Sequence, residues 1–159
     1  MYQKVLCFTS ASGGTGKSTI TKEIAAELVK SPVEGHSPRV CIVDIDYGHG
    51  SQDTLLGVLP KYSIYDVRDA LLKNPSGIIT DWNAIEKYIS YSTELDIHLV
   101  PELHQQEREE LTADEFCLLI NSLRSFYDYI LIDSGQQLTC ASICAMRISD
   151  YTFYLIEDS

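Results

Sequence analysis

The sequence predicts an α/β protein built around a mostly parallel sheet. Short β-branched apolar runs alternate along the chain with amphipathic segments, and a glycine-rich turn joins the first run to the first amphipathic segment. Buried strands alternating with helices form right-handed βαβ units, and such units make parallel sheets. A chain of 159 residues can bury one sizeable core, so we expect a single domain over residues 1–159.

The element order follows from apolar spacing and turn chemistry. The first strand is followed by a helix that opens near Lys17, and Thr112 with Glu115 forms a capping pattern before a later helix. The charged stretch 102–110 is expected to be a solvent-facing loop or helix edge. Strands are expected at 5–8, 39–46, 96–101, 128–133 and 150–156. Helices are expected at 17–30, 61–74, 82–91, 112–127 and 138–148, and a short helix is expected to start at 54–57.

The chain stops directly after its last expected strand. A parallel sheet is normally covered by helices on both faces, so another helix is expected to follow that strand. We therefore expect the domain to be truncated at its C-terminus.

Composition and charge exclude several classes of function. Hydrophobic residues make up 45% of the chain and charged residues 22%, which is typical of a globular protein, and the net charge is −11. Lysines and arginines are scattered, so we expect no direct contact with nucleic acid or with an anionic membrane. The sequence shows no basic leader and no apolar run of about 18 residues, so we expect a cytoplasmic protein.

The five cysteines form no metal-ligand spacing. Cys7 and Cys41 fall in expected core strands, and Cys140 and Cys144 lie a turn apart on an expected helix. An odd, dispersed set is typical of buried thiols in a reducing compartment.

The glycine-rich turn has the chemistry of a phosphate-binding loop. Its glycines let successive N–H groups converge on an anion, and the helix that follows adds its positive N-terminal end. Lys17 is placed to hold β- and γ-phosphates, and the Ser18 hydroxyl is placed for Mg²⁺. Ala11 stands where the pattern G-x-x-x-x-G-K-[ST] has its first glycine. We predict a nucleotide site with Mg²⁺ formed by Ser12, Gly13, Gly14, Thr15, Gly16, Lys17, Ser18 and Thr19, and the family resemblance given below implies that the nucleotide is ATP.

Three carboxylates fall at the carboxyl ends of expected strands, where ligands bind in open α/β sheets. Asp44, Asp46 and Asp133 beside a phosphate loop suit the oxygen coordination of Mg²⁺, and Asp44 or Asp46 is a candidate to orient an attacking water. The other interpretation is that each carboxylate caps a turn. The four histidines pair with no nucleophile, so none is assigned to catalysis.

In this order, the residues resemble the MinD/ParA group of ATPases, which have a deviant Walker A loop. Residues 13–19 match that loop, Val43-Asp44-Ile45-Asp46 matches the second element, and residues 132–135 match the third. The resemblance implies a three-layer P-loop NTPase fold and a homodimer that joins through the nucleotide face. It also implies that Lys17, Asp44 and Asp46 act in hydrolysis and that Ser18, Asp44 and Asp133 hold the metal.

The sequence departs from this family at two places. Ser12 replaces the signature lysine, which in the family reaches the partner's phosphates, and the family's C-terminal third is absent. Comparable trans-acting arginines contribute about 10³–10⁵ in rate, so we expect weak hydrolysis. The stretch 59–67 is similar to the TadZ/CpaE branch, which implies protein partners in a polar pilus-assembly machinery. That branch often carries an upstream receiver-like domain, which this sequence lacks.

Two other functions remain open. A scaffold that binds nucleotide without hydrolysing it fits Ala11 and Ser12. A bacterial tyrosine kinase has the same three-element layout, but it requires an arginine-proline element after the D-x-D pair and a C-terminal tyrosine cluster. Residues 47–50 do not supply the first, and the sequence lacks the second.

Overall fold

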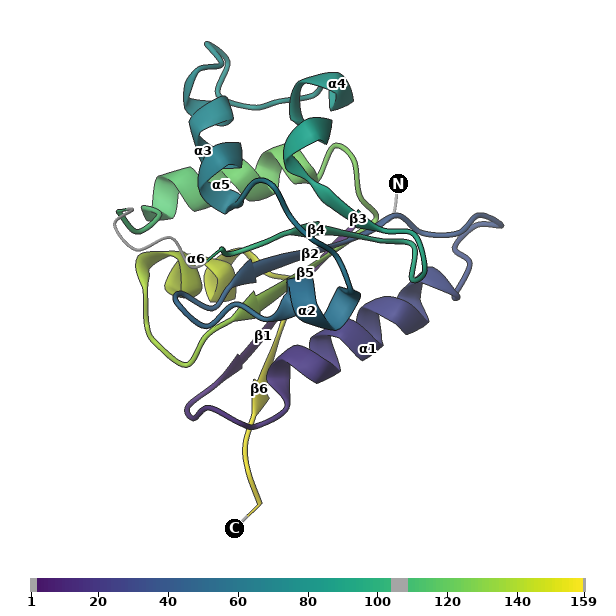
Figure 1. Cartoon of the computed structure of the whole chain (residues 1–159), viewed down its shortest axis with the longest axis vertical. Coiled ribbons are helices and arrows are strands. Elements are labelled where there is room, and N and C mark those ends of the chain that lie inside the picture. Colours follow the sequence, from purple (N-terminus) through teal and green to yellow (C-terminus); the bar gives the residue numbers. More distant parts are fainter. Residues whose placement is uncertain (1–2, 104–108, 159) are drawn as a thin grey trace.

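The computed structural model describes residues 3–103 and 109–158 and shows a six-stranded sheet with helices on both faces (Figure 1). The strand order is β3-β4-β2-β5-β1-β6, and every neighbouring pair is parallel except β3 and β4. The strands are β1 (Lys4–Ser10), β2 (Val40–Ile45), β3 (Ser90–Ser92), β4 (Ile97–Val100), β5 (Tyr129–Ser134) and β6 (Tyr151–Leu155).

The helices form two layers. Helices α1 and α2 cover one face of the sheet, and α3, α5 and α6 cover the other (Figure 1). Their bounds are α1 (Lys17–Val29), α2 (Gln52–Leu56), α3 (Ile64–Leu72), α4 (Trp82–Ile85), the 3₁₀ turn η1 (Glu86–Tyr88), α5 (Ala113–Leu123) and α6 (Cys140–Ile148). The three-layer α/β architecture predicted from the sequence is confirmed.

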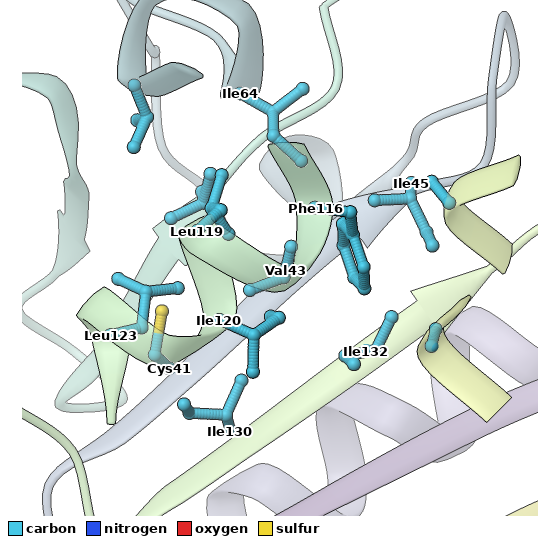
Figure 2. Close-up of a cluster of buried hydrophobic side chains, with 14 of the residues drawn as sticks. Cys41, Val43, Ile45, Ile64, Phe116, Leu119, Ile120, Leu123, Ile130 and Ile132 are labelled. Atoms are coloured by element: carbon cyan, nitrogen blue, oxygen red, sulfur yellow. The ribbon is translucent and has the colours of Figure 1, made fainter. Parts of the chain in front are cut away.

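Alternation along the strands divides the buried side chains between two cores. In β1, Val5 and Cys7 face the core under α3, α5 and α6, whereas Leu6 and Phe8 face the core under α1. Figure 2 shows the first of these cores, in which apolar side chains of α5 lie against those of β2 and β5. Burying one such Leu or Phe contributes about 1.5–3 kcal/mol, and this packing holds the strand ends that form the site.

Several expected boundaries are confirmed and one expected element is wrong. The capping box of Thr112 and Glu115 is present at the start of α5, which ends at Leu123 rather than near Tyr127. The single helix expected at 82–91 is instead α4, η1 and the short strand β3. Pairing with β4 and a hydrogen bond from Ser92 Oγ to the carbonyl of Leu56 (3.1 Å) override the local helical preference there. Of the loop expected at 102–110, residues 104–108 lie outside the described residues.

Strand register brings the predicted site elements together. Strand β5 lies between β1 and β2, so that Asp133 is level with Phe8 on one side and with Asp44 on the other. The segments that follow β1, β2 and β5 therefore leave the sheet at one edge, where parallel α/β sheets bind ligands.

Candidate nucleotide-binding site

The loop between β1 and α1 has the backbone that a phosphate site needs. Gly14 and Gly16 adopt left-handed conformations, with φ of 78° and 77°. A Cβ at either position would meet open space, so backbone conformation, rather than crowding, makes glycine necessary there. Because Gly16 is the N-cap of α1 and has no side chain, no side-chain cap competes for the helix's first N–H groups. These groups can point at an anion.

A cavity of about 370 Å³ opens over this loop. Its wall contains all eight residues predicted to bind the cofactor, together with four residues from the end of β1 and the segments that follow β2 and β5. The lining residues are Ser10, Ser12, Gly13, Gly14, Thr15, Gly16, Lys17, Ser18, Thr19, Asp46, His49 and Gln136.

Lys17 lies at the centre of the buried charges. Its Nζ is 3.1 Å from Asp133 Oδ1 and 3.5 Å from Asp46 Oδ2, and the residue is only 7% exposed. Burial alone would lower the pKa of Lys17, but the carboxylates of Asp133 and Asp46 outweigh burial and raise it. The lysine is therefore positively charged and paired with carboxylates, and binding a phosphate requires it to exchange those partners.

Asp46 approaches the segment after β5 closely. A Cβ on Gly135 would collide with the Asp46 carboxylate, so only glycine allows the two segments to lie this near each other. The backbone carbonyl of Asp46 also accepts a hydrogen bond from the backbone N–H of His49 (2.9 Å), which closes a turn after β2. These contacts place the Asp46 side chain in the wall of the cavity.

Asp44 has a different role from the other two carboxylates in the observed contacts. It is 1% exposed, and its oxygens accept backbone N–H groups of Asp46 (3.1 Å), Ser51 (3.0 Å) and Gln52 (3.1 Å). Burial and the neighbouring Asp133 raise the pKa of Asp44 to about 8, while these N–H donors oppose the shift. Asp44 thus organises the loop that leads into α2, as the turn-capping interpretation describes, while Asp46 and Asp133 converge on Lys17.

The sequence did not indicate Gln52, which connects three parts of the site. Its Nε2 donates to Asp133 Oδ2 (2.7 Å) and to the carbonyl of Ser18 (2.8 Å), and its backbone N–H binds Asp44. The side chain is fully buried, and its Oε1 has no hydrogen-bond partner among the described residues. Residues 47–53 have a loop composition, and a lone glutamine there belongs to no motif, so no sequence signal marked it.

Gln136 was also missed, although it lies directly after the third matched element. A Cβ on Gly13 would be 3.1 Å from Gln136 Oε1, so the phosphate loop and the segment after β5 are in contact. Ser12 is exposed, and its carbonyl accepts a hydrogen bond from Ser10 Oγ (2.8 Å). The position of the family's signature lysine is therefore at the surface of the cavity.

The donors around Lys17 suit magnesium. The described residues contain no cluster of three or more His, Cys, Asp or Glu side chains arranged as a metal site. Magnesium, however, is usually bound through one or two carboxylates together with substrate phosphates and waters. The hydroxyl of Ser18 and the carboxylates of Asp133 and Asp46 are hard oxygen donors of this kind, and the unpartnered carbonyl of Gln52 is a further buried acceptor beside them.

The parallel sheet, the phosphate loop and the carboxylates after β2 and β5 define a MinD/ParA-like P-loop protein. The chain belongs to the AAA_31 family, described as an AAA domain, whose model matches residues 3–158. It is 33% identical over 130 residues to the septum site-determining protein MinD of Helicobacter pylori, a match that covers 82% of this chain and 44% of that protein.

Solved structures show the same fold. A ParA family ATPase from Chlorobium tepidum TLS superposes with a TM-score of 0.78 at 24% identity, covering 96% of this chain and 60% of that one. MinD from Pyrococcus horikoshii OT3, solved in complex with Mg-ADP, superposes with a TM-score of 0.70 at 19% identity, covering 96% of this chain and 57% of that one. The chain spans less than half the length of the Helicobacter pylori MinD protein and less than two thirds of the two solved relatives. None of its described helices is long and apolar enough to cross a membrane.

Proposed function

We propose that this chain binds Mg-ATP at the loop 12–19 and acts as the nucleotide-binding part of a MinD/ParA-like switch. The observation that carries the proposal is the position of Lys17, which lies beside the phosphate loop and is paired with Asp133 and Asp46. A lysine held there by two carboxylates can transfer its charge to a phosphate while the carboxylates become free for a metal. The Mg-ADP complex of the P. horikoshii relative is consistent with this assignment.

The proposed roles follow from the contacts. Lys17 holds the β- and γ-phosphates, and Ser18 and Asp133 hold magnesium, which neutralises phosphate charge when bound. Asp46, in the cavity wall, is better placed than Asp44 to orient water. Asp44 would have to release three backbone N–H groups before it could bind metal or water.

Slow hydrolysis is the second part of the proposal. Ser12 supplies no cation at the position where the family has its lysine, so ATP would serve mainly to hold a homodimer joined through the nucleotide face. A scaffold that binds ATP without hydrolysing it is the alternative that Ala11 and Ser12 favour. Single-turnover hydrolysis at saturating Mg-ATP separates the two: slow phosphate release supports the switch, and none supports the scaffold.

The finer assignment to the TadZ/CpaE branch rests on residues 59–67 alone. We propose on that resemblance that the protein acts in the cytoplasm with a pilus-assembly machinery at a cell pole. A fluorescent fusion of the full-length protein should then form polar foci that depend on Lys17. Uniform fluorescence would contradict the pilus assignment and leave nucleotide binding untouched.

Calorimetric titration with ATP, with and without Mg²⁺, tests the main proposal. We expect binding that is tighter with Mg²⁺, followed by a doubling of mass in light scattering of the same sample. Binding without a change in mass would contradict the dimer but retain the site. No binding under either condition would overturn the proposed function.

A further inference from the structure

Two cysteines on neighbouring helices lie in direct contact. Helices α5 and α6 pack against each other on one face of the sheet (Figure 1). The Sγ atoms of Cys117 on α5 and Cys144 on α6 are 2.8 Å apart. Cys117 is partly exposed and Cys144 is 6% exposed, and the sulfur of Cys144 also lies 3.5 Å from the carbonyl of Ala113.

This separation is close to that of a bonded pair. A disulfide has an S–S length of about 2.05 Å, so bond formation requires the two sulfurs to approach by less than about 1 Å. Small changes in side-chain torsion can provide this movement while the helices stay packed. Among the described residues, no comparable sulfur contact involves Cys7, Cys41 or Cys140, so the geometry selects one pair out of five cysteines.

We propose that Cys117 and Cys144 form a reversible disulfide that joins α5 to α6, with a small disulfide such as glutathione disulfide as the oxidant. The thiolate of Cys117 attacks one sulfur of glutathione disulfide and releases one glutathione thiolate. Cys144 then loses its proton to solvent, attacks the Cys117 sulfur and releases the second glutathione. Two protein thiols are oxidised to one disulfide, and one glutathione disulfide is reduced to two thiols.

The environment sets the order of these steps. Burial, with the neighbouring Cys117 thiol, raises the pKa of Cys144 to about 12, so Cys144 is a poor first nucleophile. Cys117 is more accessible to a dissolved oxidant, and its sulfur is then presented to Cys144 within the packed interface. The reaction should therefore be slow and selective rather than a general oxidation of all five thiols.

The crosslink would act on the segment that leads from the candidate site. Strand β5 and the loop carrying Gln136 lie between the two cysteines, which are 27 positions apart in the sequence. Closing a loop of this length restricts the unfolded chain, and we expect the oxidised protein to melt about 10 °C higher than the reduced protein. The same bond would fix the middle of α6 relative to α5.

Thiol counting and peptide mapping test the proposal. The purified chain is incubated with glutathione disulfide, alkylated, digested without reductant and analysed by mass spectrometry. We expect one crosslinked peptide pair containing Cys117 and Cys144, loss of both of these free thiols without a glutathione adduct on either, and full reversal by dithiothreitol. C144S should accumulate a glutathione adduct on Cys117, and C140S should behave as the wild type.

Three outcomes would overturn the proposal: a disulfide that includes Cys140, a stable glutathione adduct on the wild-type protein without a crosslink, or five unreacted thiols. Mapping the wild-type protein does not depend on whether the serine variants fold. Melting with and without dithiothreitol provides a second readout, because a Tm rise that C117S retains would show that another pair is responsible.

Discussion

Two regions of the molecule reverse the usual distribution of polar and apolar side chains. At the carboxyl ends of β1, β2 and β5, charged groups are buried: Lys17, Asp44 and Asp133 are 7%, 1% and 0% exposed. Along β6, apolar groups are exposed instead. The buried charge carries information about function, because ordinary packing does not explain it.

The two regions differ in how their atypical groups are satisfied. Lys17 and Asp133 pair with opposite charge and Asp44 accepts backbone N–H groups, whereas Gln52 Oε1 has no hydrogen-bond partner among the residues that the structure describes. Strand β6 pairs with β1 along one edge, and although Phe153 stacks on the buried Phe8, Tyr151 and Tyr154 are each 57% exposed. The buried charges at the site can therefore exchange their present partners for a ligand. The exposed side chains of β6 can instead be covered by another protein surface.

The largest effect should come from removing the central charge. Lys17→Ala should weaken ATP binding at least 100-fold in calorimetry, because it removes the cation that faces the phosphates. It also leaves Asp133 buried without its ion-pair partner, which costs about 3–5 kcal/mol of folding stability. Circular dichroism establishes that the variant is folded before the titration.

Lys22→Ala is the matched control for Lys17. Lys22 is on the same helix and is paired with Glu23 near the surface, at 2.9 Å. ATP affinity should remain within about twofold of wild type, as expected for an exposed ion pair. Equal affinity in Lys17→Ala and wild type would overturn the assignment of the phosphate loop.

The next largest effect is expected at Ser12, where the family has a lysine. Ser12→Lys should raise the rate of phosphate release at least tenfold, because Ser12 is exposed and, in the proposed dimer, a lysine there would face the nucleotide of the partner subunit. Turnover is measured with a phosphate-release assay across protein concentrations. No gain in rate at any concentration would show that Ser12 does not limit hydrolysis.

Variants of Gln52 test whether this residue, which the sequence did not indicate, contributes to Mg-ATP binding. Gln52→Ala removes the hydrogen bonds to Asp133 and Ser18, and we expect about a tenfold weaker affinity for Mg-ATP with a smaller change for ATP without metal. Gln52→Glu places a second carboxylate against Asp133 and should weaken Mg-ATP binding further.

Gln137→Ala controls for loss of a glutamine near the site. Gln137 is exposed on the loop after β5, and its substitution should leave both affinities unchanged. If Gln52→Ala lowers affinity equally with and without Mg²⁺, Gln52 supports the fold of the loop and not the metal site.

Local patterns in the sequence were sufficient for the fold and for the phosphate loop. Strand alternation, the glycines before Lys17 and the carboxylates after β2 and β5 depend on neighbouring residues, so they could be read along the chain. Strand β3 depends on pairing with β4, and Gln52 depends on a contact with Asp133 that spans 81 positions. Contacts of this kind have no local signature, which is why a helix was expected at 82–91 and Gln52 was overlooked.

The contacts of the carboxylates and cysteines could not be predicted from local sequence either. Three aspartates at strand ends suggested one cluster, but side-chain direction divides them, because Asp44 binds the backbone of the loop while Asp46 faces Lys17. The spacing of the cysteines suggested separate thiols, and only the packing of α5 on α6 brings Cys117 to Cys144. The residues that would lie together at the strand ends were therefore easier to predict than the contacts that they make there.

The smallest expected effect concerns self-association of the chain through strand β6. Tyr154 in strand β6 is 57% exposed, and Ile156, which directly follows the strand, is 80% exposed. An edge strand with exposed apolar side chains promotes association between chains. Sedimentation velocity of the 159-residue chain should show concentration-dependent self-association without nucleotide, and the double variant Tyr154→Lys/Ile156→Lys should reduce it severalfold.

Leu59→Lys is the control for the β6 double variant, because it replaces an exposed apolar side chain outside β6. Leu59 is 97% exposed in the segment between α2 and α3, near β3 at the edge of the sheet opposite to β6, so its substitution should leave association through β6 unchanged. Mg-ATP provides the second comparison, because a dimer joined through the nucleotide face should persist in the β6 double variant. If the double variant instead abolishes the ATP-dependent dimer and leaves association without nucleotide intact, the two regions belong to one interface and the distinction between them fails.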